Sequence, residues 1–188
     1  MTCGLCTPCY GFSQVSYLSI YDKGIDDTAR RSILSLKNGK PFFADIIGMG
    51  LSMVLENEID DRALEQVLVS VPTHPDDHPE RDYNPPDMLA QRIARFTGLP
   101  HVPNALIKTE PHSQKEYSTS MERFEEIQGK FDAAVNLDGK HVLLIDDLMT
   151  TGATASECAR ICIANGAMSV HVILAGRSFH FLEGREYG

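Results

Sequence analysis

Positive charge is scarce in this sequence: 17 lysine and arginine residues stand against 26 aspartate and glutamate residues, for a formal net charge of −9. Proteins that bind nucleic acid or anionic membranes non-specifically need clustered Lys and Arg side chains. Direct nucleic-acid binding is therefore not expected. A phosphorylated small ligand remains compatible with this charge, because backbone N–H groups bind phosphate without any basic side chain.

Long apolar runs are also missing. The nearest is Ile46 to Leu55, which is far shorter than the roughly 20 residues that cross a bilayer as a helix. The first residues lack the basic, apolar and small-residue zones of a signal peptide. We therefore expect no membrane contact and a cytoplasmic location, where thiols stay reduced.

Internal repeats and low-complexity tracts are absent as well. The 188 residues, 43% of them hydrophobic, suit one domain with a sizeable core and a short appendage. We place the appendage at residues 1–60, as a Cys-rich head followed by helices. Residues 61–188 are expected to form an α/β domain.

Apolar strands alternate with amphipathic helices along the chain, which predicts an α/β fold with a doubly wound parallel sheet. In such a sheet, ligands bind at the carboxyl ends of the strands. The two glycines of the second helix, Gly48 and Gly50, serve close packing or form half of a dinucleotide fingerprint, whose third glycine position holds Met53. Strands are expected at 67–72, 105–108, 131–135, 141–146 and 169–175, and helices at 26–39, 42–56, 84–98, 119–127 and 153–165.

One segment carries most of the chemistry. The apolar strand that begins at His141 ends in Asp146 and Asp147, which can accept hydrogen bonds from the vicinal hydroxyls of a ribose. Gly152 lets the backbone approach a ligand closely, and the following helix N-terminus favours a phosphate. The alternative is a turn whose acids are solvated and whose threonines only cap the helix. The predicted phosphate loop is Leu148, Met149, Thr150, Thr151, Gly152, Ala153 and Thr154.

This order of strand, two acids, Thr-Thr-Gly and helix resembles the phosphate loop of type I phosphoribosyltransferases, which bind 5-phosphoribosyl-1-pyrophosphate (PRPP). The chain is most similar to the ComF-like, amidophosphoribosyltransferase-related family of competence-associated proteins. The similarity extends over nearly the whole chain. Residues 69–74, 81–84 and 89–90 follow the family's pyrophosphate-loop region, 114–131 its flexible hood, and 21–55 its N-terminal helical region.

The resemblance implies an enzyme that binds PRPP with Mg²⁺ and transfers phosphoribosyl to an amine, a base or another small acceptor, releasing pyrophosphate. It also implies a hood over the site and a homodimer, and it leaves the acceptor unidentified. Arg81 and Arg123 are the expected contacts to the leaving group, although each could instead pair on the surface with a neighbouring acid. The implied catalytic residues are Asp146, Asp147, Arg81 and Arg123, and the implied pyrophosphate loop is Pro72, Thr73, His74 and Arg81.

Three departures from the family pattern bear on catalysis. Salvage enzymes acting on purine bases carry an aspartate base where Thr150 stands, and a threonine hydroxyl cannot take that role near neutral pH. The family's Arg-Gly-Phe-Asn is Arg-Asp-Tyr-Asn here, which brings the charge of Asp82 towards the expected pyrophosphate. The usual hood asparagine is Glu126, and the hood spacing is one residue longer. These departures favour an alternative: a non-catalytic PRPP-binding regulatory protein or an accessory in DNA uptake.

Metal-ligand residues occur in two other places. Cys3, Cys6 and Cys9 have the two-residue spacing with which thiolates grip Zn²⁺. A fourth ligand is missing locally, so free thiols are the alternative. His74, Asp76, Asp77 and His78 lie in a Pro-rich loop, where we expect solvated side chains and no metal. Cys158 and Cys162 lie four residues apart on a helix and are expected to be buried core residues.

Overall fold

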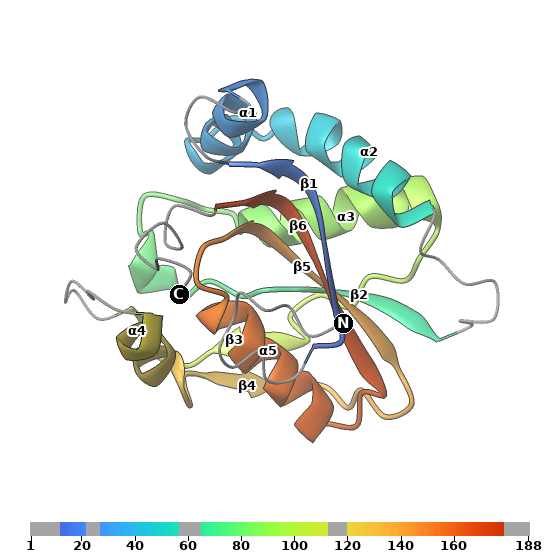
Figure 1. The fold of residues 1–188 in the computed structure, drawn as a ribbon, viewed down its shortest axis with the longest axis vertical. Coiled ribbons are helices and arrows are strands. Elements are labelled where there is room, and N and C mark those ends of the chain that lie inside the picture. The colour runs from blue at the N-terminus through green and yellow to red at the C-terminus, as the bar shows by residue number, and fades with distance from the viewer. Residues whose placement is uncertain (1–11, 22–26, 57–64, 113–119, 179–188) are drawn as a thin grey trace, which may run out of the picture.

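A parallel sheet forms the centre of the fold in a computed structural model that describes residues 12–21, 27–56, 65–112 and 120–178 (Figure 1). Within these ranges the strand order is β1-β6-β5-β2, all parallel, and β3 pairs with β4 in a separate antiparallel ribbon. The predicted α/β class and parallel sheet are therefore confirmed. The strands are β1 Gln14–Ile20, β2 Gln66–Ser70, β3 Leu106–Lys108, β4 Phe131–Ala133, β5 His141–Met149 and β6 Ser169–Arg177.

Helices cover both faces of the sheet (Figure 1). α1 Asp27–Lys37, α2 Phe43–Glu56 and α3 Pro85–Thr97 lie on one face, and α5 Ala153–Ala164 lies on the other. α4 Ser120–Ile127 lies beside the β3–β4 ribbon, on the side of α5. No helix in these described ranges has the length and apolar character needed to cross a membrane.

Strand β5 shows why the sheet is buried on both sides. Val142 and Leu144 join the core beneath α5, whereas Leu143 and Ile145 join the core beneath α1, α2 and α3. Successive side chains of a strand point to opposite faces, so an uninterrupted apolar run suits a strand covered on both faces. Cys158 and Cys162 are fully buried in the α5 core, as predicted.

Strand β1 was not predicted, because its alternation of polar and half-buried residues is weak at the edge of the sheet. Its pairing with β6 identifies it as a strand, for example at Val15 opposite Val172. The predicted boundary at residue 60 falls outside the described ranges and stays a prediction. Within them, Leu36 and Leu51 share one core with Leu89, so helices before that boundary pack directly onto the α/β domain.

The glycines of α2 serve close packing. A Cβ on Gly48 would lie 2.5 Å from Cβ of Arg92 on α3, and a Cβ on Gly50 would lie 2.9 Å from a methyl group of Leu18 on β1. Both glycines lie inside the helix and not in a strand-to-helix turn. The packing interpretation is therefore confirmed, and the dinucleotide fingerprint is wrong.

Candidate functional site

The two acids lie near the carboxyl end of β5, the strand between β2 and β6. The sequence predicted that the strand ends at Asp146. Instead β5 continues to Met149, because β6 is long enough to pair with it: Leu148 lies opposite Gly176 and Met149 opposite Arg177. Leu148 and Met149 are therefore strand residues, and the loop proper is shorter than predicted.

The loop after β5 has the conformation that the glycine was expected to provide. Gly152 has φ 82°, in the left-handed region, and immediately precedes α5. Ala153 and Thr154 already form the first turn of that helix. Thr151 Oγ1 accepts only a long hydrogen bond, 3.4 Å, from the Ala153 N–H. The first turn of α5 contains no acidic residue, so its N–H groups and helix dipole favour an anion.

Asp147 and Asp146 have different partners. Asp147 Oδ1 lies 3.0 Å from Lys37 Nζ at the end of α1. Asp146 Oδ1 accepts a hydrogen bond of 2.8 Å from the Asp147 backbone N–H. Burial, followed by the neighbouring Asp147 carboxylate, raises the pKa of Asp146 to about 7, against the opposing effect of Lys37.

A cavity of about 160 Å³ joins the acid pair to segments that are distant in sequence. The predicted Pro72, Thr73 and Arg81 line it, together with Leu148 and Thr154 from the loop region. The other described residues that line it are Lys37, Val71, Asp77, His78, Pro85, Pro86, Lys108, His112, Phe131, Asp146 and Asp147. The cavity therefore brings together carboxylates, three cationic side chains and the start of a helix.

Several predicted site residues lie outside this cavity. Among its described lining residues, Met149, Thr150, Thr151, Gly152 and Ala153 do not occur. The same holds for His74, whose Nδ1 accepts a 3.2 Å hydrogen bond from the Asp76 N–H and caps the short 3₁₀ turn Pro75–Asp77. Arg123 is half-buried on α4 and does not line the cavity either. For these residues, contact with a ligand stays a prediction.

Arg81 borders the cavity beside an aromatic ring. Its guanidinium lies 6.0 Å from the ring centroid of Tyr83, within the range of a cation–π contact. The neighbouring Glu80 pairs with His78 at 3.3 Å, Oε1 to Nδ1. Asp82 is exposed and lines a separate, adjoining hollow of about 470 Å³. The extra negative charge of the Arg-Asp-Tyr-Asn segment thus lies beside the acid cavity and not among its lining residues.

Asp77 and Lys108 form a buried ion pair that sequence reasoning missed. Lys108 Nζ lies 2.6 Å from Asp77 Oδ2, and the two side chains are 2% and 4% exposed. The Asp77 carboxylate also accepts a 2.6 Å hydrogen bond from the His112 N–H. Burial raises the pKa of Asp77, but the hydrogen bonds from Lys108 and His112 outweigh it and lower the pKa overall. The predicted solvated loop is therefore wrong at Asp77, because β3 covers that side chain.

The donor set at the acid pair fits Mg²⁺. Two neighbouring carboxylates border a cavity, and magnesium is typically held by one or two carboxylates together with the phosphates of a substrate. Within the described ranges no group of three His, Cys, Asp or Glu side chains is placed to hold a metal, at the acid pair or away from it, so Mg²⁺ there would need the phosphates of a substrate as further ligands. Cys3, Cys6 and Cys9 lie outside those ranges, so the zinc site stays a prediction.

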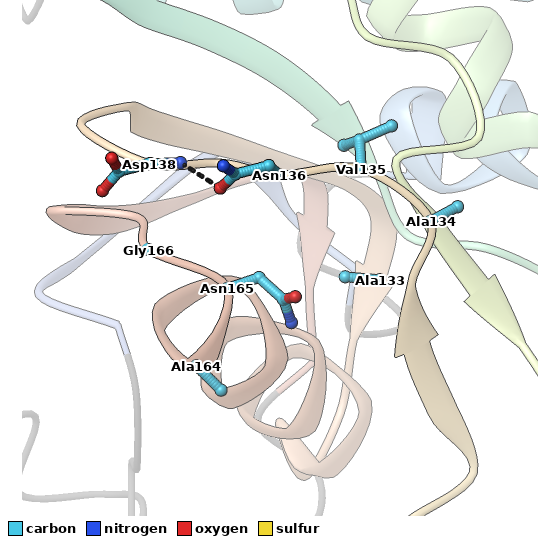
Figure 2. Close-up of a pocket in the computed structure, with 8 residues that line it drawn as sticks. All are labelled: Ala133, Ala134, Val135, Asn136, Asp138, Ala164, Asn165 and Gly166. Atoms are coloured by element: carbon cyan, nitrogen blue, oxygen red, sulfur yellow. Dashed lines mark hydrogen bonds between the residues drawn. The ribbon is translucent and has the colours of Figure 1, made fainter.

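A different pocket, of about 400 Å³, lies at the amino ends of β5 and β6 (Figure 2). The segments that precede these two strands line it. Alanines line much of it, with Asn136 and Asp138 joined by a 2.9 Å hydrogen bond from the Asp138 N–H to Asn136 Oδ1 (Figure 2). Its described lining includes no basic side chain. It also lies at the edge of the sheet opposite to the carboxyl ends, where parallel sheets bind ligands. The acid cavity is therefore the better candidate.

No protein-family model matches the chain. The chain is 29% identical over 105 residues to DNA utilization protein YhgH of Escherichia coli K12. This alignment covers 56% of the chain and 46% of that protein. It is 26% identical over 113 residues to Competence protein F of Haemophilus influenzae. That alignment covers 58% of the chain and 49% of the relative. The chain thus spans about half the length of these relatives. They confirm the predicted resemblance to competence-associated proteins.

Solved structures offer distant likenesses. A hypoxanthine phosphoribosyltransferase from Staphylococcus aureus has a TM-score of 0.48 and 13% identity, over 72% of the chain and 72% of that structure. An adenine phosphoribosyltransferase from Leishmania tarentolae has a TM-score of 0.45 and 19% identity, over 79% of the chain and 76% of that structure.

Proposed function

We propose that the chain binds PRPP with Mg²⁺ at Asp146 and Asp147 and transfers its phosphoribosyl group to a small acceptor. The observation that carries this proposal is the composition of the acid cavity. The two carboxylates, the first turn of α5 at Thr154 and the guanidinium of Arg81 all border it. These groups match the ribose hydroxyls, the 5-phosphate and the pyrophosphate of PRPP, respectively.

In the proposed reaction, the bond between C1 of the ribose and the pyrophosphate oxygen breaks, and a bond from C1 to the acceptor forms. The acceptor loses a proton to the solvent, and pyrophosphate leaves with the electron pair. Asp146 and Asp147 orient the ribose, and Arg81 stabilises the charge that develops on the leaving group. When bound, Mg²⁺ supplies further positive charge at the pyrophosphate. Thr150 cannot serve as the base, so the proposal favours an acceptor that attacks C1 without first being deprotonated, such as a neutral amine.

Calorimetric titration of PRPP with Mg²⁺ tests the binding step. The wild-type protein should bind saturably, and Asp146→Asn/Asp147→Asn should lose measurable binding while remaining folded by circular dichroism. Asp132→Asn, which removes an exposed carboxylate from β4, is the matched control and should bind as the wild type does. A folded wild-type protein that does not bind PRPP would refute the proposed function.

A second candidate is a non-catalytic PRPP-binding protein that acts in the uptake or use of DNA. Thr150 in place of an acid supports it, as do the names of the two relatives, a DNA utilization protein and a competence protein. Release of pyrophosphate separates the two candidates. Release that depends on an added acceptor supports the enzyme, whereas PRPP binding without release from any tested amine or base supports the regulatory protein.

A further inference from the structure

Lys37 is the last residue of α1, and its side chain reaches the acid pair. Its Nζ lies 3.0 Å from Asp147 Oδ1, with the Lys37 side chain 29% exposed and that of Asp147 10% exposed. The ammonium therefore lies where a ligand can reach it. Lys37 and Arg81 are the two described residues that line both the acid cavity and the adjoining hollow.

Tyr83 fixes the positions of both cationic segments. Its hydroxyl donates a hydrogen bond to the Leu36 carbonyl, next to Lys37, and accepts one of 2.8 Å from the Gly39 N–H. These contacts attach the end of α1 to the segment before α3. The same ring lies under the Arg81 guanidinium at 6.0 Å. One aromatic side chain thus holds the lysine and the arginine at a shared boundary of the cavity.

The charges of the site show what Lys37 does when a ligand binds. In the structure, Lys37 is the counter-ion of Asp147. A divalent cation held by the two carboxylates would take over that role. The lysine ammonium would then lack a partner at the edge of a cavity that Arg81 also lines. An unpaired, partly desolvated ammonium is costly, so it favours a nearby anion.

We propose that Lys37 is a pyrophosphate-binding residue: its ammonium, which contacts Asp147 in the structure, binds the pyrophosphate group of PRPP in the complex. This inference rests on the proposed function, because it assigns a role within the same site. Lys37 and Arg81 then bind the leaving group from two segments that Tyr83 holds together.

Ligands with and without pyrophosphate distinguish this role from a structural one. Affinities for PRPP and for ribose 5-phosphate, each with Mg²⁺, are measured by calorimetry for the wild type, Lys37→Met, Lys37→Arg and Lys40→Met. Lys40 is exposed, lies three residues further on and lines neither cavity, so Lys40→Met is the matched control.

Lys37→Met should weaken PRPP binding about tenfold or more, as expected for a lost charge-assisted hydrogen bond. Binding of ribose 5-phosphate should stay within about twofold, because that ligand lacks the group that Lys37 contacts. Lys37→Arg should retain most PRPP affinity, and Lys40→Met all of it. If Lys37→Met does not fold, Lys37→Gln replaces it.

Two outcomes would overturn the inference while leaving the proposed function intact. One is unchanged PRPP affinity in Lys37→Met. The other is an equal loss for both ligands, which would mean that Lys37 only holds Asp147 in place. Absence of PRPP binding to the folded wild-type protein would instead refute the proposed function, and the inference with it.

Discussion

Two adjacent carboxylates in this protein have different partners and different surroundings. Asp147 is paired with Lys37, whereas Asp146 accepts a backbone N–H and has a pKa raised to about 7 by burial and by Asp147. Near neutral pH the pair therefore retains part of a proton. A cation that binds both carboxylates displaces that proton, so cation binding and protonation compete at Asp146.

The raised pKa makes a prediction about stability. The folded protein binds the Asp146 proton more tightly than the unfolded chain does, so ionisation of Asp146 destabilises the folded state. This cost is absent below the unfolded pKa, grows as the pH rises towards about 7 and then levels off. Asp146→Asn, which mimics the protonated acid, should therefore gain stability over the wild type across this window, by at most about 1.4 kcal/mol per pH unit.

Urea denaturation of both proteins at several values between pH 4 and pH 8 measures this difference. Contributions from the carboxylates that do not interact with Asp146 cancel, because the two proteins share them. Asp132→Asn controls for the loss of one negative charge. A difference in unfolding free energy that stays constant, or that shrinks as the pH rises, would contradict the assignment of a raised pKa to Asp146.

Among the elements, the contact between α2 and α3 bears most directly on the site. α3 begins with Pro85 and Pro86, which line the acid cavity. α2 holds α3 in place at Gly48, next to Arg92, whose Nε also pairs with Asp45 Oδ1 at 2.6 Å. The spacing of two helices thus sets the position of one wall of the cavity.

Alanine substitutions at Gly48 and Gly50 should differ in effect. A Cβ at Gly48 meets the Arg92 Cβ at 2.5 Å, which can move only if α3 moves, whereas a Cβ at Gly50 meets a terminal methyl of Leu18 at 2.9 Å. Gly48→Ala should therefore destabilise the protein by about 1–3 kcal/mol. In Gly50→Ala, a helix-propensity gain of up to about 1 kcal/mol should largely offset a smaller clash.

Chemical denaturation of the two variants beside the wild type measures both effects. Each variant adds one methyl group to the same helix, so each is the control for the other. Equal free energies of unfolding for the two variants would contradict this prediction. They would show that α3 accommodates a methyl group at Gly48 without a loss of stability.

At the scale of the whole molecule, the acid cavity is assembled from segments that lie far apart in the chain. Lys37, Arg81, Lys108 and Asp147 all line it, and they come from α1, the loop before α3, β3 and β5. A ligand that contacts all these segments binds only the folded protein. Its binding free energy therefore adds to the stability of the whole fold.

PRPP with Mg²⁺ should accordingly raise the melting temperature. At a ligand concentration about 100 times the Kd, the gain is about 2.7 kcal/mol, which corresponds to roughly 5–11 °C for a chain of this size. Differential scanning fluorimetry measures the shift. Asp146→Asn/Asp147→Asn should show none at the same concentrations, and an equal shift in both proteins would place the binding elsewhere.

Local pattern was enough to predict much of this protein. Neighbouring residues encode the apolar run before Asp146 and the glycine before α5. They also encode helix α3, which Asn84 and Pro85 begin and Gly98 ends. The structure confirms each of these features within a few positions. The parallel sheet followed from the alternation of strands and helices. These features depend on the backbone conformations that individual residues prefer and on the spacing of apolar residues along the chain. A short window of sequence contains both kinds of information.

Only the tertiary structure decided which side chains meet. The contact of Lys37 with Asp147, the burial of Asp77 by Lys108 and the pairing of β1 with β6 join residues that are far apart in sequence. Each depends on how whole elements pack, and no local pattern marks it. The sequence by itself thus determined the acid pair and its loop, whereas packing determined the cations that face them, because electrostatic contacts act through space and not along the chain.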